Sequence, residues 1–241
     1  MKLLLLGGTS EARALAKRLN PDIDLISSLA GRVPDPALPV GPVRIGGFGG
    51  IDGLRMYLQD NEITAVVDAT HPFAATITAT AAQVCAGLGL PHLVLARPAW
   101  PRGDAIVVAD DRQAAQTVKD RGYQRVFLTT GRSGTTAFRE SDAWFLIRAV
   151  TPPDAETLPP DHEILLSRGP YGYDNELALL VDHRIDALVT KNSGGGMTRA
   201  KLDAAAALNI PVLMVDRPGL PVGVTTAATV DEAEAWVRER R

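Results

Sequence analysis

Short runs of apolar residues alternate with longer segments of helical period along the whole chain. The runs predict strands at 3–6, 24–28, 43–45, 63–69, 92–96, 105–108, 126–129, 145–150, 163–166, 186–190 and 212–215. The helical segments between them lie at about 11–19, 52–59, 111–121, 175–183, 198–208 and 231–240, with a further Ala- and Thr-rich helix ending near 87. Strands that are apolar at every position are typical of parallel sheets covered on both faces. The alternation therefore predicts a doubly wound parallel α/β fold.

The second half of the chain repeats the first. Gly89–Pro98 and Asn209–Pro218 both contain a proline, an apolar strand and a closing Arg-Pro, and equivalent positions are 120 residues apart in a chain of 241. The repeat predicts two similar domains, 1–121 and 122–241, with a central crevice. Because both halves end alike, they could also exchange their terminal elements. The alternative explanation of the repeat is that all α/β units resemble one another, in which case it does not indicate two similar domains.

Composition excludes several classes of protein. Hydrophobic residues make up 46% and charged residues 22% of the chain, which is typical of a globular protein. The net charge of −3 argues against a general nucleic-acid partner. The single cysteine, Cys85, excludes a disulfide framework, and the four dispersed histidines predict no metal site. The apolar run at the N-terminus is too short to span a membrane, so we expect a soluble, cytoplasmic protein.

Cations follow the carboxyl ends of six predicted strands. They are Arg32, Arg97, Arg132, Arg168, Lys191 and Arg217. Open α/β sheets bind ligands at this edge, and arginine suits carboxylate and phosphate groups. Any one of these residues is equally explained by a surface salt bridge. Six of them in a net acidic chain predict a strongly anionic ligand, or two.

A glycine-containing segment follows the first predicted strand, where dinucleotide-binding folds place their pyrophosphate loop. Gly7, Thr9, Ser10 and Glu11 are the candidate cofactor residues of this loop. The fingerprint is degenerate because Thr9 replaces a glycine, and Ser10 could instead cap the helix. Hydroxyl and helix N-terminal N–H groups would then contact phosphate.

The end of the second strand predicts which dinucleotide is used. An NAD site would carry an acidic residue there, whereas this chain offers Ser28 and then Arg32. The basic residue favours the 2′-phosphate of NADPH. Residues 46–50 follow the third strand as Gly-Gly-Phe-Gly-Gly, and we expect Gly47 and Phe48 to lie beside the cofactor, although a surface turn would have the same composition.

Two further segments close the central strands. Thr70 and His71 follow the fourth strand, where His71 could donate a hydrogen bond or a proton, or be structural. The matching place in the second half holds a cation, an amide and small residues that can form an anion-binding nest, namely Lys191, Asn192, Ser193 and Gly194.

With these motifs placed, the sequence resembles the precorrin-6A reductase family of cobalamin biosynthesis over nearly its whole length. The segments that carry the resemblance are 7–12, 68–74, 97–98, 130–132, 167–170, 191–194 and 210–212. The most specific are Asp-Ala-Thr-His-Pro-Phe-Ala at 68–74 and Lys-Asn-Ser-Gly at 191–194. The resemblance implies an NADPH-dependent enzyme that reduces one double bond of a corrinoid macrocycle, precorrin-6A to precorrin-6B. It also implies two Rossmann-like domains with the cofactor and the tetrapyrrole between them.

A tetrapyrrole that carries several carboxylates suits the cations at the strand ends. The candidate substrate-binding residues are Arg97, Arg132, Arg168, Lys191, Asn192, Ser193, Gly194 and Arg217. The proton that accompanies the hydride has three candidate sources, His71, Lys191 and Tyr171. Neighbouring pathway enzymes are possible partners. Two other functions stay open: a non-catalytic, two-domain anion-binding or sensor protein, and an NADP-dependent reductase of another polycarboxylate.

Overall fold

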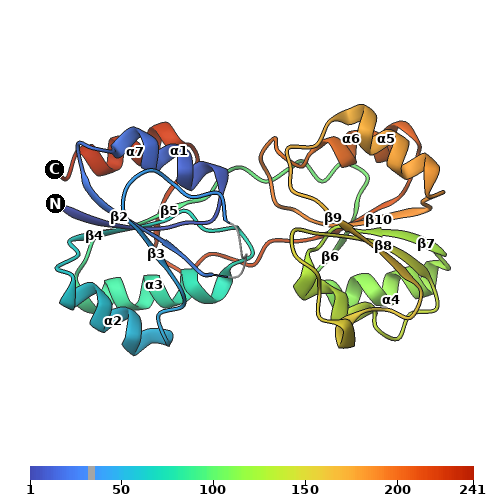
Figure 1. Ribbon diagram of the computed structural model, residues 1–241, viewed down its shortest axis with the longest axis horizontal. Helices are drawn as coiled ribbons and strands as arrows, with labels where there is room; N and C mark the ends of the chain where they lie inside the picture. Colours follow the sequence, from blue (N-terminus) through green and yellow to red (C-terminus); the bar gives the residue numbers. More distant parts are fainter. Residues whose placement is uncertain (32–35) are drawn as a thin grey trace. The chain divides into compact units, whose positions relative to one another are not determined.

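The computed structural model describes residues 1–31 and 36–241, so Arg32 lies outside the described residues. The chain divides into two compact units, shown in Figure 1. Unit 1 comprises Met1–Pro98 and Pro218–Arg241, and unit 2 comprises Ala99–Arg217. Each unit contains a six-stranded parallel sheet with helices on both faces. The predicted fold class is confirmed.

Unit 1 has the strand order β12-β5-β4-β1-β2-β3. Its elements are β1 (Lys2–Leu6), α1 (Ser10–Leu19), β2 (Asp24–Leu29), β3 (Val43–Ile45), α2 (Gly50–Asp60), β4 (Ala65–Asp68), α3 (Ala75–Leu88), β5 (His92–Leu95), β12 (Thr225–Ala227) and α7 (Val230–Arg238). Read from β3, this is the order 3-2-1-4-5-6 of dinucleotide-binding sheets, with β12 in the sixth place.

Unit 2 has the equivalent order β6-β11-β10-β7-β8-β9. Its elements are β6 (Ile106–Val108), α4 (Asp111–Arg121), β7 (Arg125–Leu128), η1 (Arg132–Phe138), β8 (Trp144–Ala149), η2 (Ala155–Thr157), β9 (His162–Leu166), α5 (Tyr173–Asp182), β10 (Ala187–Lys191), α6 (Ala200–Ala207) and β11 (Val212–Val215). Here the sixth place is taken by β6, which precedes the other five strands in the chain.

The two units exchange their sixth strands. Strand β6 leaves the first half of the chain and pairs with β11, and β12 returns from the second half and pairs with β5. The exchange considered from the repeat is therefore confirmed. The predicted boundary between residues 121 and 122 is corrected, because β6 and α4 belong to unit 2 whereas β12 and α7 belong to unit 1.

The apolar strands bury side chains on both faces of each sheet, as their continuous hydrophobicity predicts. Leu3 and Leu5 of β1 pack in the core beneath α1 and α7, whereas Leu4 and Leu6 pack in the core beneath α2 and α3. In unit 2, Phe127 belongs to the core formed with α5 and α6. Fully burying one such side chain contributes about 1.5–3 kcal/mol, so these layers stabilise each sheet between its helices.

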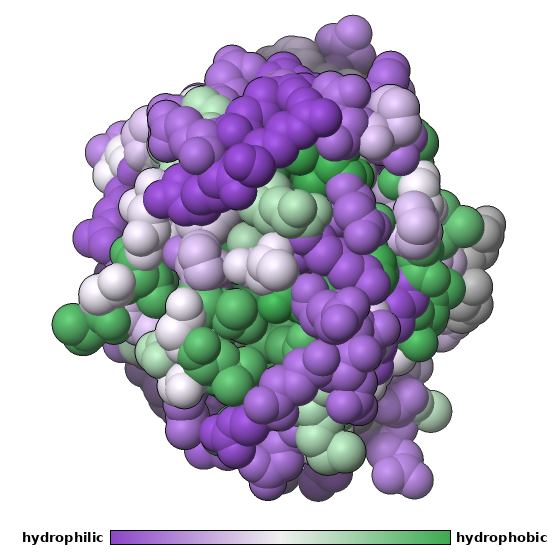
Figure 2. All heavy atoms as spheres, turned by 90° about the vertical axis from the view of Figure 1, so that its left-hand side faces the viewer, coloured by the Kyte–Doolittle hydropathy of each residue, from purple (hydrophilic) through white to green (hydrophobic). Residues whose placement is uncertain are grey.

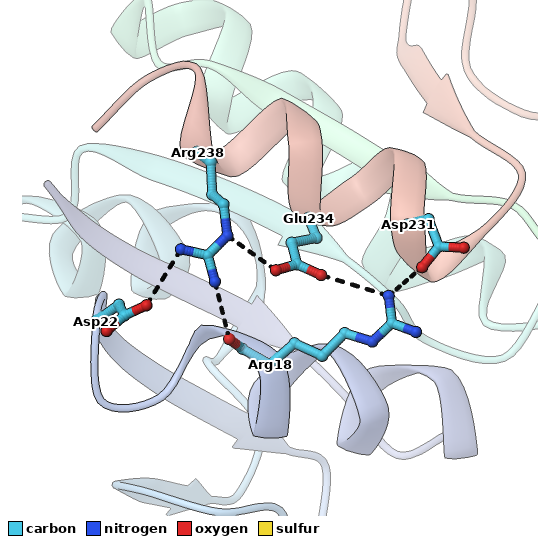
Figure 3. A network of polar contacts seen from close by, with 5 residues as sticks. All are labelled: Arg18, Asp22, Asp231, Glu234 and Arg238. Carbon is cyan, nitrogen blue, oxygen red and sulfur yellow. Dashed lines mark hydrogen bonds and ion pairs between the residues drawn. The ribbon is translucent and has the colours of Figure 1, made fainter.

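Helix α7 packs on α1 through an apolar core and a polar rim. Ala233 and Val237 of α7 are fully buried in the core of unit 1. Figure 3 shows the polar contacts at the rim, made by Arg18, Asp22, Asp231, Glu234 and Arg238. Exposed ion pairs contribute only about 0.2–1 kcal/mol each. Apolar burial therefore provides most of the stability of the exchanged helix, and the charges favour its correct placement.

Figure 2 shows the side of the molecule that lies at the left of Figure 1. Hydrophobic residues reach the surface in the middle of this view, between broader hydrophilic regions. Within residues 1–31 and 36–241, no helix has the length and apolar character needed to cross a membrane.

Candidate functional site

The glycine loop of unit 1 lies where the strand order reverses between β1 and β4. The N–H group of Gly7 donates a hydrogen bond to Ser28 O at 2.9 Å, which ties the loop to the end of β2. Gly8 has φ +114°, a left-handed conformation that favours glycine. A Cβ atom at Gly8 would meet no described heavy atom within 4 Å. The backbone at Gly8 is therefore not covered by described side chains.

Thr9 is buried and fixes the loop from inside. Its hydroxyl donates to Ala69 O at 2.7 Å and accepts from the N–H group of Ala12 at 3.1 Å. Thr9 therefore caps α1 and joins the helix to the end of β4. The one hydroxyl proton of Thr9 is thus donated within the protein. The expected contact of this hydroxyl with a cofactor phosphate stays a prediction.

Arg97 neutralises an acidic residue at the start of α1. Its Nη1 atom lies 2.7 Å from Glu11 Oε2, and the Ser10 hydroxyl donates to the same oxygen at 3.0 Å. Burial alone would raise the pKa of Glu11, but Arg97 and the surrounding hydrogen bonds outweigh burial and lower it. Glu11 is therefore a carboxylate. Arg97, expected at the substrate, is placed in unit 1 beside the predicted cofactor loop.

Arg44 of β3 is a cation that sequence reasoning missed. Its guanidinium donates to Ser28 Oγ at 3.2 Å and to Gly47 O at 2.7 Å, and it also donates to Gly46 O. Its Cζ atom lies 3.9 Å from the ring centroid of Phe48. Arg44 thus gathers the predicted cofactor residues Ser28, Gly47 and Phe48 at the carboxyl ends of β2 and β3. The sequence did contain a signal for Arg44, because it is a charged residue in the middle of the predicted strand 43–45.

The segment after β4 is shaped by Asp68. This carboxylate is buried, and its Oδ1 atom accepts from the N–H group of Thr70 at 3.0 Å and from its hydroxyl at 2.7 Å. The exposed His71 accepts a 3.3 Å hydrogen bond at Nδ1 from the N–H group of Phe73. In its neutral form His71 then carries its proton on Nε2. Thr70 and His71 accordingly belong to the same edge of unit 1 as the glycine loop.

Lys191 lies at the equivalent edge of unit 2, at the end of β10. Its Nζ atom donates to Thr130 O at 2.7 Å, across the point where the order of this sheet reverses between β7 and β10. The N–H group of Ser193 donates to Lys191 O at 2.7 Å, and Gly194 follows with φ +66°. The chain therefore turns sharply after Lys191, as its small residues predict.

The amide of Asn192 is occupied by the protein itself. Asn192 is buried, its Oδ1 atom accepts from the N–H group of Trp100 at 2.8 Å, and its Nδ2 atom donates to Trp100 O at 3.1 Å. Trp100 Nε1 donates to Gly195 O at 2.8 Å. Arg217 Nε donates to Asn192 O at 2.7 Å. Asn192 thus supports the loop structurally, and its expected contact with substrate stays a prediction.

A buried ion pair lies behind the loop that carries Arg168. Arg148 of β8 and Glu176 of α5 form two hydrogen bonds, of 2.9 and 2.7 Å, with side chains only 7% and 2% exposed. The Cζ atom of Arg148 lies 4.0 Å from the ring centroid of Tyr171. The hydroxyl of Tyr171 donates to Ser167 O at 3.0 Å. This arrangement fixes Tyr171 and hence the segment around Arg168, which is itself exposed.

The predicted residues fall into two groups. The described cofactor candidates all lie in unit 1. The substrate candidates lie in unit 2 apart from Arg97, and Arg132 is exposed at the start of η1. Unit 1 has the sheet order and open loop of a dinucleotide-binding domain, and unit 2 presents cations at its own carboxyl edge. Together they define a two-domain α/β protein of dinucleotide-binding topology.

Comparison with known proteins identifies the family. The family model described as "Precorrin-6x reductase CbiJ/CobK" matches residues 2–238. The chain is 66% identical over 236 residues to a precorrin-6A reductase of Mycobacterium tuberculosis, with 98% of this chain and 97% of that protein covered. It is 54% identical to a precorrin-6A reductase of Rhodococcus erythropolis, with 98% and 97% covered. A solved structure of CobK precorrin-6A reductase matches with a TM-score of 0.91 and 36% identity, over 99% of this chain and 97% of that one.

The chain belongs to the precorrin-6x reductase family. The predicted resemblance is therefore confirmed, and with it the expectation that the protein is a reductase of cobalamin biosynthesis. The non-catalytic alternative is not supported, because the relatives that this chain matches over 97% of their length are named as reductases.

Proposed function

We propose that the protein catalyses the NADPH-dependent reduction of one double bond of precorrin-6A, giving precorrin-6B. The observation that carries this proposal is the 66% identity with the precorrin-6A reductase of Mycobacterium tuberculosis, over 98% of this chain. The reaction adds a hydride and a proton to the macrocycle, and the nicotinamide supplies the hydride when bound. The protein's own residues must then hold the cofactor, anchor an acidic substrate and provide the proton.

The cofactor belongs to unit 1 in this proposal. The 3-2-1-4-5-6 strand order and the open backbone at Gly8 support binding of the pyrophosphate at the first turn of α1. Thr9 keeps this turn in place through its bonds to Ala69 and Ala12. Arg97 compensates the charge of Glu11, which would otherwise repel a pyrophosphate at the helix N-terminus.

Arg44 is the described residue best placed to select NADPH over NADH. It contacts Ser28 at the end of β2, the position beside which a dinucleotide fold places the 2′ substituent of the ribose. Its guanidinium is fixed by the carbonyls of the Gly46–Gly47 turn and the ring of Phe48, so little rotamer freedom is lost when phosphate binds. Arg32 remains the second candidate, on the sequence alone.

Exchange of Arg44 for glutamine tests this assignment. A hydrogen bond to a charged group contributes about 1.5–3 kcal/mol, so Arg44→Gln should weaken NADPH binding about 10- to 100-fold. NADH binding should hardly change, which would also show that the loop is intact. Arg55→Gln, on the exposed side of α2, is the matched control, and Arg32→Ala measures the second candidate. Equal losses for both dinucleotides in Arg44→Gln would contradict the assignment.

The substrate belongs to unit 2, whose cations stand at the carboxyl ends of its strands. They are Arg132 after β7, Arg168 after β9, Lys191 at the end of β10 and Arg217 after β11. The backbone of Ser193 and Gly194 follows Lys191 at the same edge. A tetrapyrrole with several flexible acid arms would share these contacts. Because an exposed pair contributes only about 0.2–1 kcal/mol, no single arginine should be decisive.

Paired substitutions therefore test substrate binding better than single ones. Arg132→Ala or Arg168→Ala alone should raise the KM for precorrin-6A several-fold, and the double variant should raise it much further. Rising salt should weaken substrate binding in the wild type more than in the double variant. Arg121→Ala combined with Arg139→Ala removes the same charge from exposed positions of unit 2 and is the control. A folded Arg132/Arg168 double variant with unchanged KM and salt dependence would move the carboxylate site elsewhere.

Lys191 is the proton donor that we favour among the three candidates. The hydroxyl proton of Tyr171 is already donated to Ser167 O, and His71 belongs to the cofactor side of the protein. Lys191 lies at the substrate edge and carries protons as an ammonium group. We therefore expect Lys191→Met to lower kcat at least about 100-fold, the scale of general acid catalysis, and Tyr171→Phe or His71→Gln to lower it less. The absorbance change of the tetrapyrrole reports the rate.

A reductase of another polycarboxylate is the competing function, and turnover of small keto acids with NADPH would favour it. The cytoplasmic location and the neighbouring pathway enzymes expected as partners belong to the same proposal. The crevice expected between the two halves stays a prediction from the sequence.

A further inference from the structure

Helix α4 brings a carboxylate to the substrate edge of unit 2. Asp111 is the first residue of α4, which reaches unit 2 together with the exchanged strand β6. Its Oδ2 atom lies 3.8 Å from Lys191 Nζ, and the same ammonium donates to Thr130 O at 2.7 Å. Lys191 is therefore held between a carboxylate from α4 and a carbonyl from the end of β7.

Asp111 and the residues around it are largely buried, although most residues in the first turn of a helix are exposed. The side chains of Asp111 and Lys191 are 24% and 15% exposed, and Thr130 is 5% exposed. Asp111 Oδ1 and Thr130 Oγ1 are inaccessible to solvent. A Cβ atom at Gly134 would lie 2.1 Å from Thr130 Oγ1 and 3.1 Å from Asp111 Oδ1, so the two oxygens face the same small space. Burial raises the pKa of Asp111, and Lys191 and Thr130 partly offset this effect.

Helix capping does not account for Asp111. The N-cap of α4 is Asp110, whose Oδ1 atom accepts from the N–H group of Gln113 at 2.8 Å. A second acid in the first turn of a helix is favourable when it is exposed to solvent. Asp111 is instead largely buried, and burial of a carboxylate disfavours its charged form. A helix start alone therefore does not explain the burial of this carboxylate.

We propose that Asp111 is a positioning residue that orients the Lys191 ammonium for proton donation during the reduction. This inference rests on the proposed role of Lys191. In the step itself an N–H bond of Lys191 breaks, the proton passes to the macrocycle, the electron pair stays on Nζ, and solvent returns a proton to the amine. The exchange of β6 and α4 then has a catalytic consequence, because it supplies the counter-ion of the donor.

Other charged groups lie at the same edge of the sheet. They are Asp110, the N-cap of α4, Arg132 at the start of η1, and Asp216 and Arg217 after β11. Asp216 is paired with Arg102 at 2.7 Å, so its charge is largely compensated. Asp111 is the acidic group with a described contact to Lys191 Nζ.

Asp111→Asn tests the inference, with Asp110→Asn as the matched control because asparagine is as good an N-cap as aspartate. We expect kcat to fall at least about tenfold in Asp111→Asn, with the KM values for precorrin-6A and NADPH changed less than twofold. The acid limb of the kcat–pH profile that reports Asp111 should disappear in this variant. Asp110→Asn should retain both kcat and the limb.

A second measurement needs no turnover. Acetic anhydride labelling of Lys191, quantified by mass spectrometry, should become several-fold faster in Asp111→Asn, because the amine is no longer held beside the Asp111 carboxylate. Asp111→Ser, which also suits a helix start, replaces Asp111→Asn if that variant does not fold. Unchanged labelling and unchanged kcat in a folded Asp111 variant would overturn the inference. If Lys191→Met instead keeps full kcat, the donor role of Lys191 fails, whatever the labelling shows.

Discussion

A lysine buried in unit 2 should make the stability of the protein depend on pH. Lys201 of α6 is 4% exposed, donates to Thr198 O at 3.0 Å and lies 5.1 Å from the ring centroid of Trp100. Burial lowers the pKa of Lys201 to about 7, Arg148 lowers it as well, and Glu176 partly offsets the shift. The ordinary pKa of a lysine side chain is 10.5. The folded protein therefore releases this proton more than three pH units before the unfolded chain does.

The sign of the effect follows from this difference. At a pH below about 7 both states hold the proton, and burial of the charge destabilises the folded protein fully. Above that pH the unfolded chain binds more protons than the folded protein, so stability rises with pH until the unfolded lysine also titrates. One pKa unit corresponds to about 1.4 kcal/mol. Lys201 should therefore add about 2 kcal/mol to the free energy of unfolding between about pH 6.5 and about pH 8.5.

Urea unfolding of Lys201→Met measures this contribution. Substitution of Trp236 by phenylalanine leaves Trp100 and Trp144, both in unit 2, as the fluorescent probes. In that background Lys201→Met should be more stable than its parent at about pH 6.5, and the advantage should shrink by about 2 kcal/mol at about pH 8.5. Lys119→Met, on the exposed face of α4, should follow the parent at both values. An advantage of the same size at both pH values would refute the reasoning.

Two other substitutions test the contacts that hold the segment around Arg168 in unit 2 and the Gly-Gly-Phe turn in unit 1. Glu176→Gln leaves Arg148 charged and buried without its carboxylate, so we expect a loss of about 3–5 kcal/mol in the unfolding free energy of unit 2, and a smaller loss when Arg148→Met is added. Additive losses would contradict this coupling. In Gly53→Ala, the new Cβ atom would lie 1.7 Å from Phe48 O, so the Gly-Gly-Phe turn must move. NADPH affinity, followed by its fluorescence, should fall at least about tenfold, and unchanged affinity would place the cofactor elsewhere.

The sequence predicts the elements of this fold well because its strands are apolar throughout. The ends of the eleven strands with predicted ranges lie within two residues of the observed ends, as at 126–129 against Arg125–Leu128. The short strand Thr225–Ala227 has no predicted range. The sequence does not predict which sheet each of the two sixth strands, β6 and β12, joins. His92–Leu95 and Val212–Val215 are each followed by Arg-Pro and a short strand, so local sequence is equally compatible with either sheet. Which sheet each short strand joins depends on tertiary pairing, which the pattern does not contain.

The candidate site was predictable at the level of backbone and charge. Glycines and strand-end cations mark both sheet edges, as expected. The partners of those residues were not predictable, because Arg44, Arg148 and Asp111 act across elements that are distant in sequence. Arg44 and Arg148 can be noticed in the sequence, because each is a charged residue inside a predicted strand. Such residues in otherwise apolar strands are worth testing first as buried ion pairs or loop supports.

The central claim is that the protein transfers a hydride from NADPH to the precorrin-6A macrocycle. The most direct measurement incubates the purified protein anaerobically with precorrin-6A and NADPH, and follows the absorbance of both compounds together with the mass of the product. We expect one NADPH to be oxidised for each macrocycle that gains two hydrogens, with NADH a poor substitute and small keto acids unchanged. Stoichiometric binding of NADPH and precorrin-6A by the folded protein without any change in the mass of the tetrapyrrole would contradict the claim.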